Sequence, residues 1–196
     1  MNNISQLVQA AHQNAIDKGW WEEPRTYGEL IALVHSEVSE ALEDYRAGRK
    51  PAQVWYEKKG AIGAQSANEQ IDADWKPCGI PSELADICIR IFDIAGKHEW
   101  GSLLEKEVLS LKGMKPNEIW DEAPFAGKLS MLHVVLSKSL ESYYAINIPE
   151  TILQLAGAVV AAEMIAQEYG IDLDRAIAEK MAYNATRPQR HGGKVL

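Results

Sequence analysis

Apolar residues recur at three- and four-residue spacing along most of the chain, and no long segment alternates apolar and polar positions. This spacing places apolar side chains on one face of an α-helix, whereas a half-buried strand needs a period of two. The pattern therefore predicts an all-α protein, a helical bundle in which each helix buries one face. Helices are expected over residues 4–18, 26–48, 81–100, a shorter segment up to 112, 129–144, 149–169 and 173–184.

Capping residues mark two of the predicted helix starts. Thr26 and Glu29 have the spacing of a capping box, in which the threonine accepts from the third amide and the glutamate reaches back. Pro81 suits the first turn of a helix, and Glu83 places a negative charge near the positive end of the helix dipole.

Two segments lack the helical pattern. Residues 49–80 are rich in Gly, Pro, Ala and polar residues, with one short strand-like piece at 54–56. Segments of this length in a compact domain are often lids, so we expect a long insertion with a functional role. Residues 114–128 contain two prolines and are the expected connector between halves 1–113 and 129–196, which together can also form one compact domain.

The two halves resemble each other in sequence. A shift of 98 positions places His35 on His133, and a shift of 69 aligns the helices at 81–100 and 149–169. The difference (98 − 69 = 29) is what loss of most of the insertion from the second copy would give. We interpret this as a tandem, degenerate repeat, or internal pseudo-dimer. Where the first half has Glu37, Glu40, Glu83 and Asp86, the second has Val135, Lys138, Ile152 and Leu155.

The composition limits the possible partners. A net charge of −8 argues against a broad basic face for nucleic acid, although one nucleotide needs only a local cluster of donors. The longest apolar stretch, residues 152–165, is too short for a membrane span, and the N-terminus lacks a signal-peptide pattern. Cys78 and Cys88 fit a reducing compartment. The expected protein is soluble and cytoplasmic, with no nucleic acid and no membrane as partner.

Two acidic pairs lie beside core-type positions, Glu37 with Glu40 and Glu83 with Asp86. Residues three apart share a helix face, so the members of each pair project together. Either pair alone is typical of a solvated surface. Four carboxylates gathered inside a bundle, however, repel one another unless a cation neutralises them or some take up protons.

Ligands that offer only oxygen suit Mg²⁺, with Mn²⁺ as a possible substitute. Such an ion would screen a triphosphate and polarise its phosphorus, and one carboxylate could accept a proton from an attacking water. The residues therefore predict hydrolysis of a phosphoanhydride bond.

The order of these motifs resembles the MazG-like all-α nucleoside triphosphate pyrophosphohydrolases. The likeness rests on Glu-x-x-Glu at 37–40 followed by Glu-x-x-Asp at 83–86, within the wider segments 19–21, 35–43, 79–93 and 180–192. It implies hydrolysis of a nucleoside or deoxynucleoside triphosphate to the monophosphate and pyrophosphate, a role in nucleotide-pool house-cleaning. It also implies that Glu37, Glu40, Glu83 and Asp86 are the metal ligands and catalytic residues, and that Lys180 and Asn184 contact the substrate.

Two features depart from compact members of that family. The insertion is longer, and the last helix belongs to the half without acids. The resemblance then implies that the second half replaces the partner subunit, as in the dimeric dUTPases of the same superfamily. The expected assembly is a monomeric pseudo-dimer or a homodimer.

Charged residues near these motifs are further candidates for substrate binding. Arg90 and Asp93 follow the second acidic pair on the same helix face, and form either a structural ion pair or contacts to the substrate. Arg187, Arg190 and Lys194 are the densest basic cluster, and belong either to a phosphate site or to a solvated tail.

Aromatic residues offer a second set of candidates. Trp20, Trp21 and Trp55 could stack on a base, although core or lid packing is the commoner role of a tryptophan. His35 recurs as His133 in the half without acids, which favours a packing or hydrogen-bonding role.

Two other functions compete with hydrolysis. A di-iron carboxylate bundle usually needs Glu-x-x-His on two helices, and no glutamate here is followed by histidine three positions later. A non-catalytic helical module that binds nucleotide or protein would carry the acids only as a solvated face. Loss of turnover in Glu40→Gln or Glu83→Gln with the fold preserved would favour the hydrolase.

Overall fold

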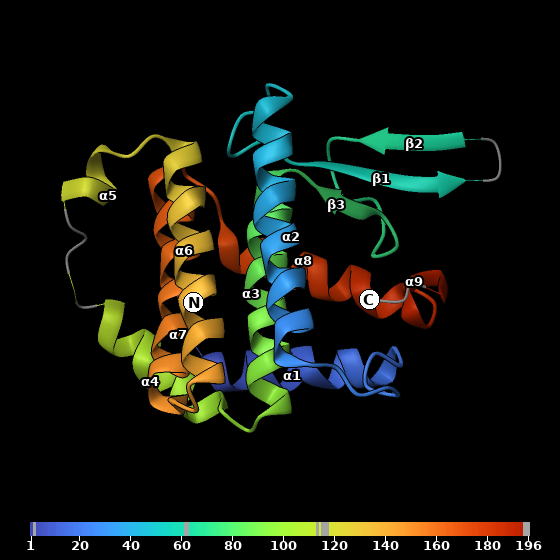
Figure 1. Ribbon diagram of the computed structural model, residues 1–196. Helices are drawn as coiled ribbons and strands as arrows, with labels where there is room; N and C mark the ends of the chain where they lie inside the picture. The colour runs from blue at the N-terminus through green and yellow to red at the C-terminus, as the bar shows by residue number, and fades with distance from the viewer. Residues whose placement is uncertain (2, 61–62, 113, 115–117, 194–196) are drawn as a thin grey trace.

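Four long helices pack side by side in the computed structural model, which describes residues 1, 3–60, 63–112, 114 and 118–193 (Figure 1). Helix α2 packs on α3 and α6, and α7 packs on α3 and α6, which closes a four-helix bundle. Helix α1 crosses one end of it, and α8 packs on α3. The prediction of an all-α bundle is confirmed. The helices are α1 (Ile4–Asp17), α2 (Tyr27–Arg46), α3 (Ile80–Lys97), α4 (Gly101–Lys112), α5 (Glu118–Glu122), α6 (Phe125–Tyr144), α7 (Ile148–Glu168), α8 (Leu173–Thr186) and α9 (Arg190–Gly193).

Helix α2 starts with the predicted capping box, whereas α6 starts earlier than predicted. The Thr26 side chain accepts from the Glu29 amide, and Glu29 Oε2 accepts from the Thr26 amide at 2.7 Å, so the capping box is formed. Helix α6 begins at Phe125, four residues before the predicted start (129 − 125 = 4). Buried Phe125 and Lys128 belong to its inner face, and Gly127 between them hides the helical pattern in the sequence.

The insertion folds as a small sheet, where the sequence suggested an irregular segment with one strand-like piece at 54–56. Strands β1 (Trp55–Gly60), β2 (Gly63–Ala67) and β3 (Lys76–Cys78) are antiparallel in the order β2-β1-β3. The β1–β2 hairpin extends away from the helices (Figure 1). Strand β2 is read Gly-Ala-Gln-Ser-Ala, which has no β-branched or aromatic residue, so its pairing with β1 determines its conformation.

One cluster of buried apolar side chains runs through both predicted halves. Helix α4, which lies in the first predicted half, packs against α7 of the second. Part of the expected connector, residues 115–117, lies outside the described residues, and the rest includes α5 and the start of α6. The division into 1–113 and 129–196 stays a prediction.

Several contacts are related by the shift of 98 positions. Helices α2 and α6 have 20 residues each and start 98 positions apart (125 − 27 = 98). Tyr27 stacks on Tyr143 at a ring distance of 3.9 Å, and the shifted pair, Phe125 and Tyr45, lie 4.7 Å apart. These contacts support the repeat, which itself stays a prediction.

The starts of α3 and α7, with N-caps Gly79 and Asn147, fit a shift of 68 (147 − 79 = 68), whereas their C-terminal ends fit a shift of 71, on either side of the 69 inferred from the sequence. Their C-cap residues are His98 and Tyr169 (169 − 98 = 71).

An added Cβ at Gly157 on α7 would lie 3.4 Å from Cγ1 of Val135, the residue that the shift of 98 aligns with Glu37. The residue in the place of Glu37 therefore packs against α7 through an apolar side chain.

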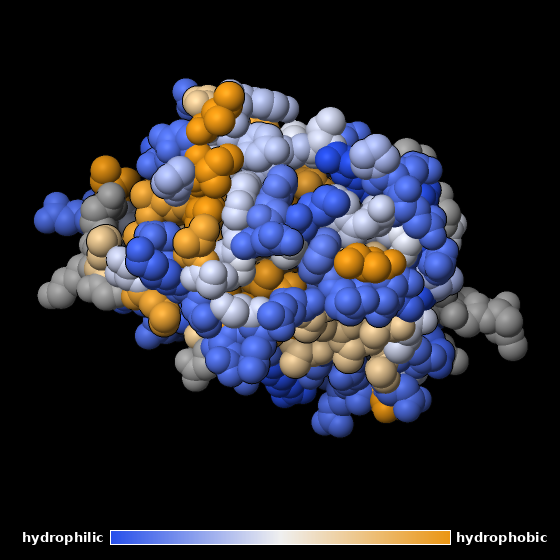
Figure 2. Space-filling view, turned by 90° about the horizontal axis from the view of Figure 1, so that it is seen from below, coloured by the Kyte–Doolittle hydropathy of each residue, from blue (hydrophilic) through white to orange (hydrophobic). Residues whose placement is uncertain are grey.

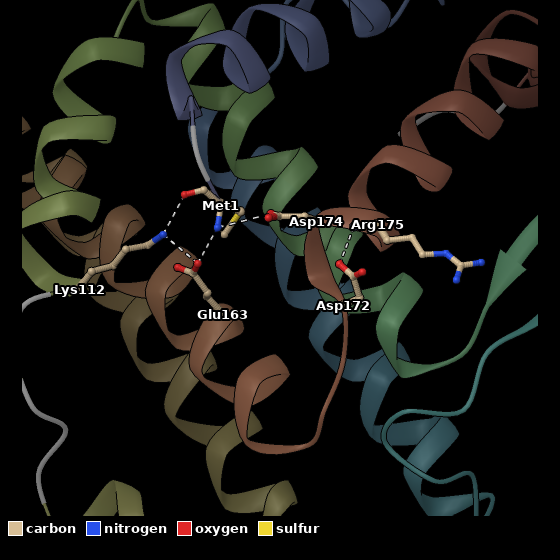
Figure 3. Close-up of polar contacts among 6 residues, drawn as sticks. All are labelled: Met1, Lys112, Glu163, Asp172, Asp174 and Arg175. Atoms are coloured by element: carbon tan, nitrogen blue, oxygen red, sulfur yellow. Dashed lines mark hydrogen bonds and ion pairs between the residues drawn. The ribbon is translucent and has the colours of Figure 1, made fainter.

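The first residue of the chain joins three helices (Figure 3). The Met1 amino group lies 2.7 Å from Glu163 on α7 and 3.4 Å from Asp174 on α8. Lys112 at the end of α4 donates to Glu163 at 2.8 Å and to the Met1 carbonyl at 3.0 Å. Asp172 caps α8 by accepting from the Arg175 amide at 3.0 Å.

Helix α7 is the one helix within the described ranges that is long and apolar enough to cross a membrane, and 56% of its apolar window is buried. A buried core helix passes the same test of length and composition. The face in Figure 2 is mainly hydrophilic, with hydrophobic residues gathered in a band on the side where α4, α6 and α7 lie in Figure 1.

Candidate metal centre and its pocket

A pocket of about 730 Å³ lies among α1, α2, α3, α8 and the sheet. Its size is within the range of small-molecule sites. The insertion contributes Glu57, Lys58, Asp74 and Lys76 and so forms one wall of the pocket.

Three carboxylates meet at this pocket. Glu37 on α2 and Glu83 and Asp86 on α3 each offer an oxygen within 4.8 Å of the other two. Glu37 and Glu83 are 4% and 5% exposed, so this is a buried cluster and not a solvated helix face. The structure thus brings together three of the four predicted ligands.

Glu40, the fourth predicted ligand, lies at the edge of the group. It lines the pocket, yet it is exposed and falls outside the set of converging oxygens. It follows Glu37 by almost one helical turn, which moves it outward along α2 while Glu37 points to α3.

Two cations already contact the cluster. Lys180 Nζ on α8 lies 2.7 Å from Asp86 Oδ2 and donates to Ser82 Oγ at 2.8 Å. Arg90 Nε donates to Glu37 Oε1 at 2.6 Å. Arg90 was expected to pair with Asp93 or to contact the substrate, and the structure gives it Glu37 as partner.

Glu83 has no such partner. Its carboxylate forms no hydrogen bond or ion pair with any residue in the described ranges, and its side chain, 5% exposed, lines the pocket from the first turn of α3. Desolvation penalises the charge of such a carboxylate, so a cation in the pocket would stabilise it. The donor set fits a hard divalent cation, since it consists only of carboxylate oxygens.

Burial shifts the protonation of the cluster. Desolvation raises the pKa of Glu83 to about 8, although nearby Lys180 opposes the shift and Asp86 adds to it. Desolvation also raises the pKa of Glu37, against the opposing effect of Arg90. For Lys180, burial lowers the pKa but the carboxylates of Asp86 and Glu83 outweigh it, so the pKa is raised and the ammonium stays charged.

These shifts predict that the metal-free protein loses stability as the pH rises. A carboxyl group whose folded pKa exceeds its unfolded value stabilises the fold below the unfolded pKa and loses that effect as the pH passes the folded pKa. With Glu83 raised from 4.5 to about 8, the melting temperature in EDTA is expected to fall between pH 5 and pH 8. Excess Mg²⁺ should remove much of this slope, and an equal slope with and without Mg²⁺ would contradict the assignment.

Helix α8 and its C-cap residue bring three side chains to the pocket. Asn184 and Arg187 both line it, as does Tyr183, whose ring lies 5.6 Å from the Arg187 guanidinium carbon. Asn184 Oδ1 is buried and has no hydrogen-bond partner among the described atoms. An unsatisfied acceptor in a pocket wall suits a donor group of a ligand.

The tryptophans have different surroundings. Trp20 and Trp21 line the pocket. Trp21 Nε1 donates to Asp93 Oδ1 at 2.9 Å, and His12 Nδ1 lies 2.7 Å from the same oxygen, so Asp93 orients an aromatic wall from within the pocket. Arg25 lies over the Trp20 ring at 5.3 Å.

Trp55 does not line this pocket. Its ring lies under Arg49 at 4.4 Å and packs on Gly79, and its Nε1 donates to Glu57 at 2.9 Å. Trp55 therefore packs within the insertion, which is the commoner role of a tryptophan.

Two other predicted features lie away from the carboxylates. His35 Nδ1 and His133 Nδ1 are 2.7 Å apart between α2 and α6, and burial lowers the pKa of both, which agrees with the hydrogen-bonding role. Arg190 donates to the Gly19 carbonyl and to the side chains of Glu22 and Glu23, so it anchors the tail. Lys194 lies outside the described residues.

Sequence reasoning missed the residues that join the insertion to α8 and α3. The Tyr56 hydroxyl donates to Glu179 Oε2 at 2.7 Å, and Ser82 Oγ donates to the Pro77 carbonyl at 2.8 Å. The first contact links positions far apart in the sequence, whereas the second links residues five positions apart across the end of the insertion. One local signal was present, because Ser82 lies in the same helical turn as the acidic pair.

No family model, curated protein or solved structure matches this chain.

Proposed function

We propose that the chain is a Mg²⁺-dependent nucleoside triphosphate pyrophosphohydrolase. The observation that carries the proposal is the convergence of Glu37, Glu83 and Asp86 within 4.8 Å at a pocket of about 730 Å³, with Glu83 buried and unpartnered among the described residues. The resemblance in motif order, which no comparison tests, points to the same reaction. As in the sequence-based expectation, the protein would act in the cytoplasm on the nucleotide pool.

The charges around the pocket suit a triphosphate. Lys18 directly after α1, Lys76 on β3 and Arg187 after α8 all line it, and none of them forms an ion pair with a described residue. Cations without a carboxylate partner in the described ranges, on three sides of a carboxylate cluster, match an anionic substrate that brings its own divalent ion.

Different residues of the pocket would then have different roles in the reaction. Glu37, Glu83 and Asp86 would hold the ion, which when bound screens the phosphates and polarises the phosphorus under attack. Glu40 lines the pocket on the same helix as Glu37 but outside the converging three, and would accept the proton of the attacking water. Asn184 Oδ1 is a free acceptor for a sugar hydroxyl or a base amine.

A substrate panel tests this proposal. Each of the common nucleoside and deoxynucleoside triphosphates is incubated with the protein and Mg²⁺, and pyrophosphate and orthophosphate are measured separately. We expect the monophosphate and pyrophosphate from at least one triphosphate, and no turnover in EDTA. Release of orthophosphate alone would place the cleavage at a different bond. No turnover of any triphosphate would favour a non-catalytic binding module.

The di-iron alternative finds no support in the cluster, because its three members are carboxylates and none is a histidine.

A further inference from the structure

The buried lysine of the metal centre is held in place by two polar contacts. Lys180 is 3% exposed, and its ammonium group lies 2.7 Å from Asp86 Oδ2 and 2.8 Å from Ser82 Oγ. Ser82 is itself 2% exposed and donates onward to the Pro77 carbonyl at 2.8 Å. The ammonium is thus held between α8 and the first turn of α3 with two of its three N–H donors engaged, which leaves at most one donor for a phosphate.

Cations already use two of the carboxylate oxygens. Lys180 forms an ion pair with Asp86 Oδ2, and Arg90 forms one with Glu37 Oε1 at 2.6 Å. A pair of divalent ions usually needs carboxylates that bridge with both oxygens, and here two of the three carboxylates have one oxygen engaged. A single Mg²⁺ needs only one or two carboxylates, since waters and phosphates complete its octahedral shell.

The net charge of the cluster also favours a single divalent ion. Three carboxylates carry −3, and Lys180 with Arg90 contributes +2, which leaves a formal −1 in a mostly buried site. One divalent ion brings the total to +1. A second would bring it to +3 in a low-dielectric region, which is strongly unfavourable unless a polyphosphate arrives with it.

We propose that Lys180 is the fixed counter-charge of the metal centre, which limits the nucleotide-free protein to one divalent ion, and that it is not a phosphate ligand. The inference rests on the proposed function, because it assumes that the carboxylates hold a metal. It assigns Lys180 a role different from the substrate contact implied by the family resemblance. A second ion enters only with the triphosphate.

Counting bound Mn²⁺ tests the inference without any turnover assay. Electron paramagnetic resonance of free Mn²⁺ gives the stoichiometry and affinity for the full chain in the absence of nucleotide. We expect one ion per wild-type chain. In Lys180→Met, loss of the adjacent positive charge should tighten the first ion by about tenfold or more and admit a second. Lys180→Arg keeps the charge and should bind one ion with nearly the wild-type affinity.

Exposed Lys106 on α4 provides the matched control because it does not line the pocket. Lys106→Met removes one charge there and should leave the number of bound Mn²⁺ ions and their affinity unchanged. An unchanged Mn²⁺ count and affinity in Lys180→Met, with a raised KM for triphosphate, would overturn the inference and restore the phosphate-ligand role. If Lys180→Met does not fold, the number of Mn²⁺ ions bound to the wild type tests the proposal by itself. Two ions bound without nucleotide would contradict it.

The two proposals fail in different ways. Two Mn²⁺ ions per nucleotide-free chain, together with pyrophosphate release, would refute the counter-charge and leave the hydrolase intact. No Mn²⁺ binding at millimolar concentrations would refute both the inference and the metal centre on which the hydrolase depends.

Discussion

Glu83→Gln is expected to lower the rate of pyrophosphate release by about 10³-fold or more, while its melting temperature in EDTA at pH 8 stays equal to or above that of the wild type. The amide cannot supply an anionic oxygen to the metal. It also removes a buried carboxyl group whose charge is penalised, since desolvation raises the pKa of Glu83 to about 8. Steady-state pyrophosphate release and a thermal melt measure the two effects.

A glutamate-to-glutamine change outside the pocket distinguishes an effect on the site from a general effect of removing one charge. Glu141 is exposed on α6 and does not line the pocket, so Glu141→Gln should retain wild-type turnover and stability. Glu40→Gln should fall between the two in turnover, because Glu40 lines the pocket without joining the three converging oxygens. Full activity in Glu83→Gln would remove Glu83 from the catalytic centre.

Gly79→Ala is expected to lower the free energy of unfolding by about 3 kcal/mol or more. Gly79 has φ +102°, and an added Cβ would lie 2.4 Å from the Gln53 carbonyl oxygen and 2.9 Å from the Trp55 ring. Because Gly79 is the N-cap of α3, the strain falls where the insertion meets the helix that carries Glu83. Mn²⁺ affinity should therefore fall as well. Urea denaturation and Mn²⁺ titration measure these two quantities.

Gly48 provides the control for the backbone contribution. Its φ is +82°, but nothing lies within 4 Å of an added Cβ, so Gly48→Ala should cost only about 1 kcal/mol. Equal destabilisation of the two variants would mean that the close approach of the insertion to Gly79 has no energetic weight.

The helices could be predicted because their causes are local. The capping box at Thr26 and Glu29, the proline in the first turn of α3 and the apolar periodicity are all readable within one helix. Convergence of Glu37 with Glu83 and Asp86 could be inferred as well, since these three residues lie beside core-type positions of their helices. Those statements depend on residues three or four positions apart.

The sequence by itself determined the helical class, most helix boundaries and the three acids that converge at the pocket. Only the tertiary structure decided that the insertion pairs into a sheet, that Glu40 stays outside the converging oxygens, and that Lys180 and Arg90 pair with Asp86 and Glu37. The physical reason is the range of the interactions. Capping and periodicity act within a helical turn, whereas strand pairing, burial and the choice of a charge partner depend on segments that meet only when the chain folds.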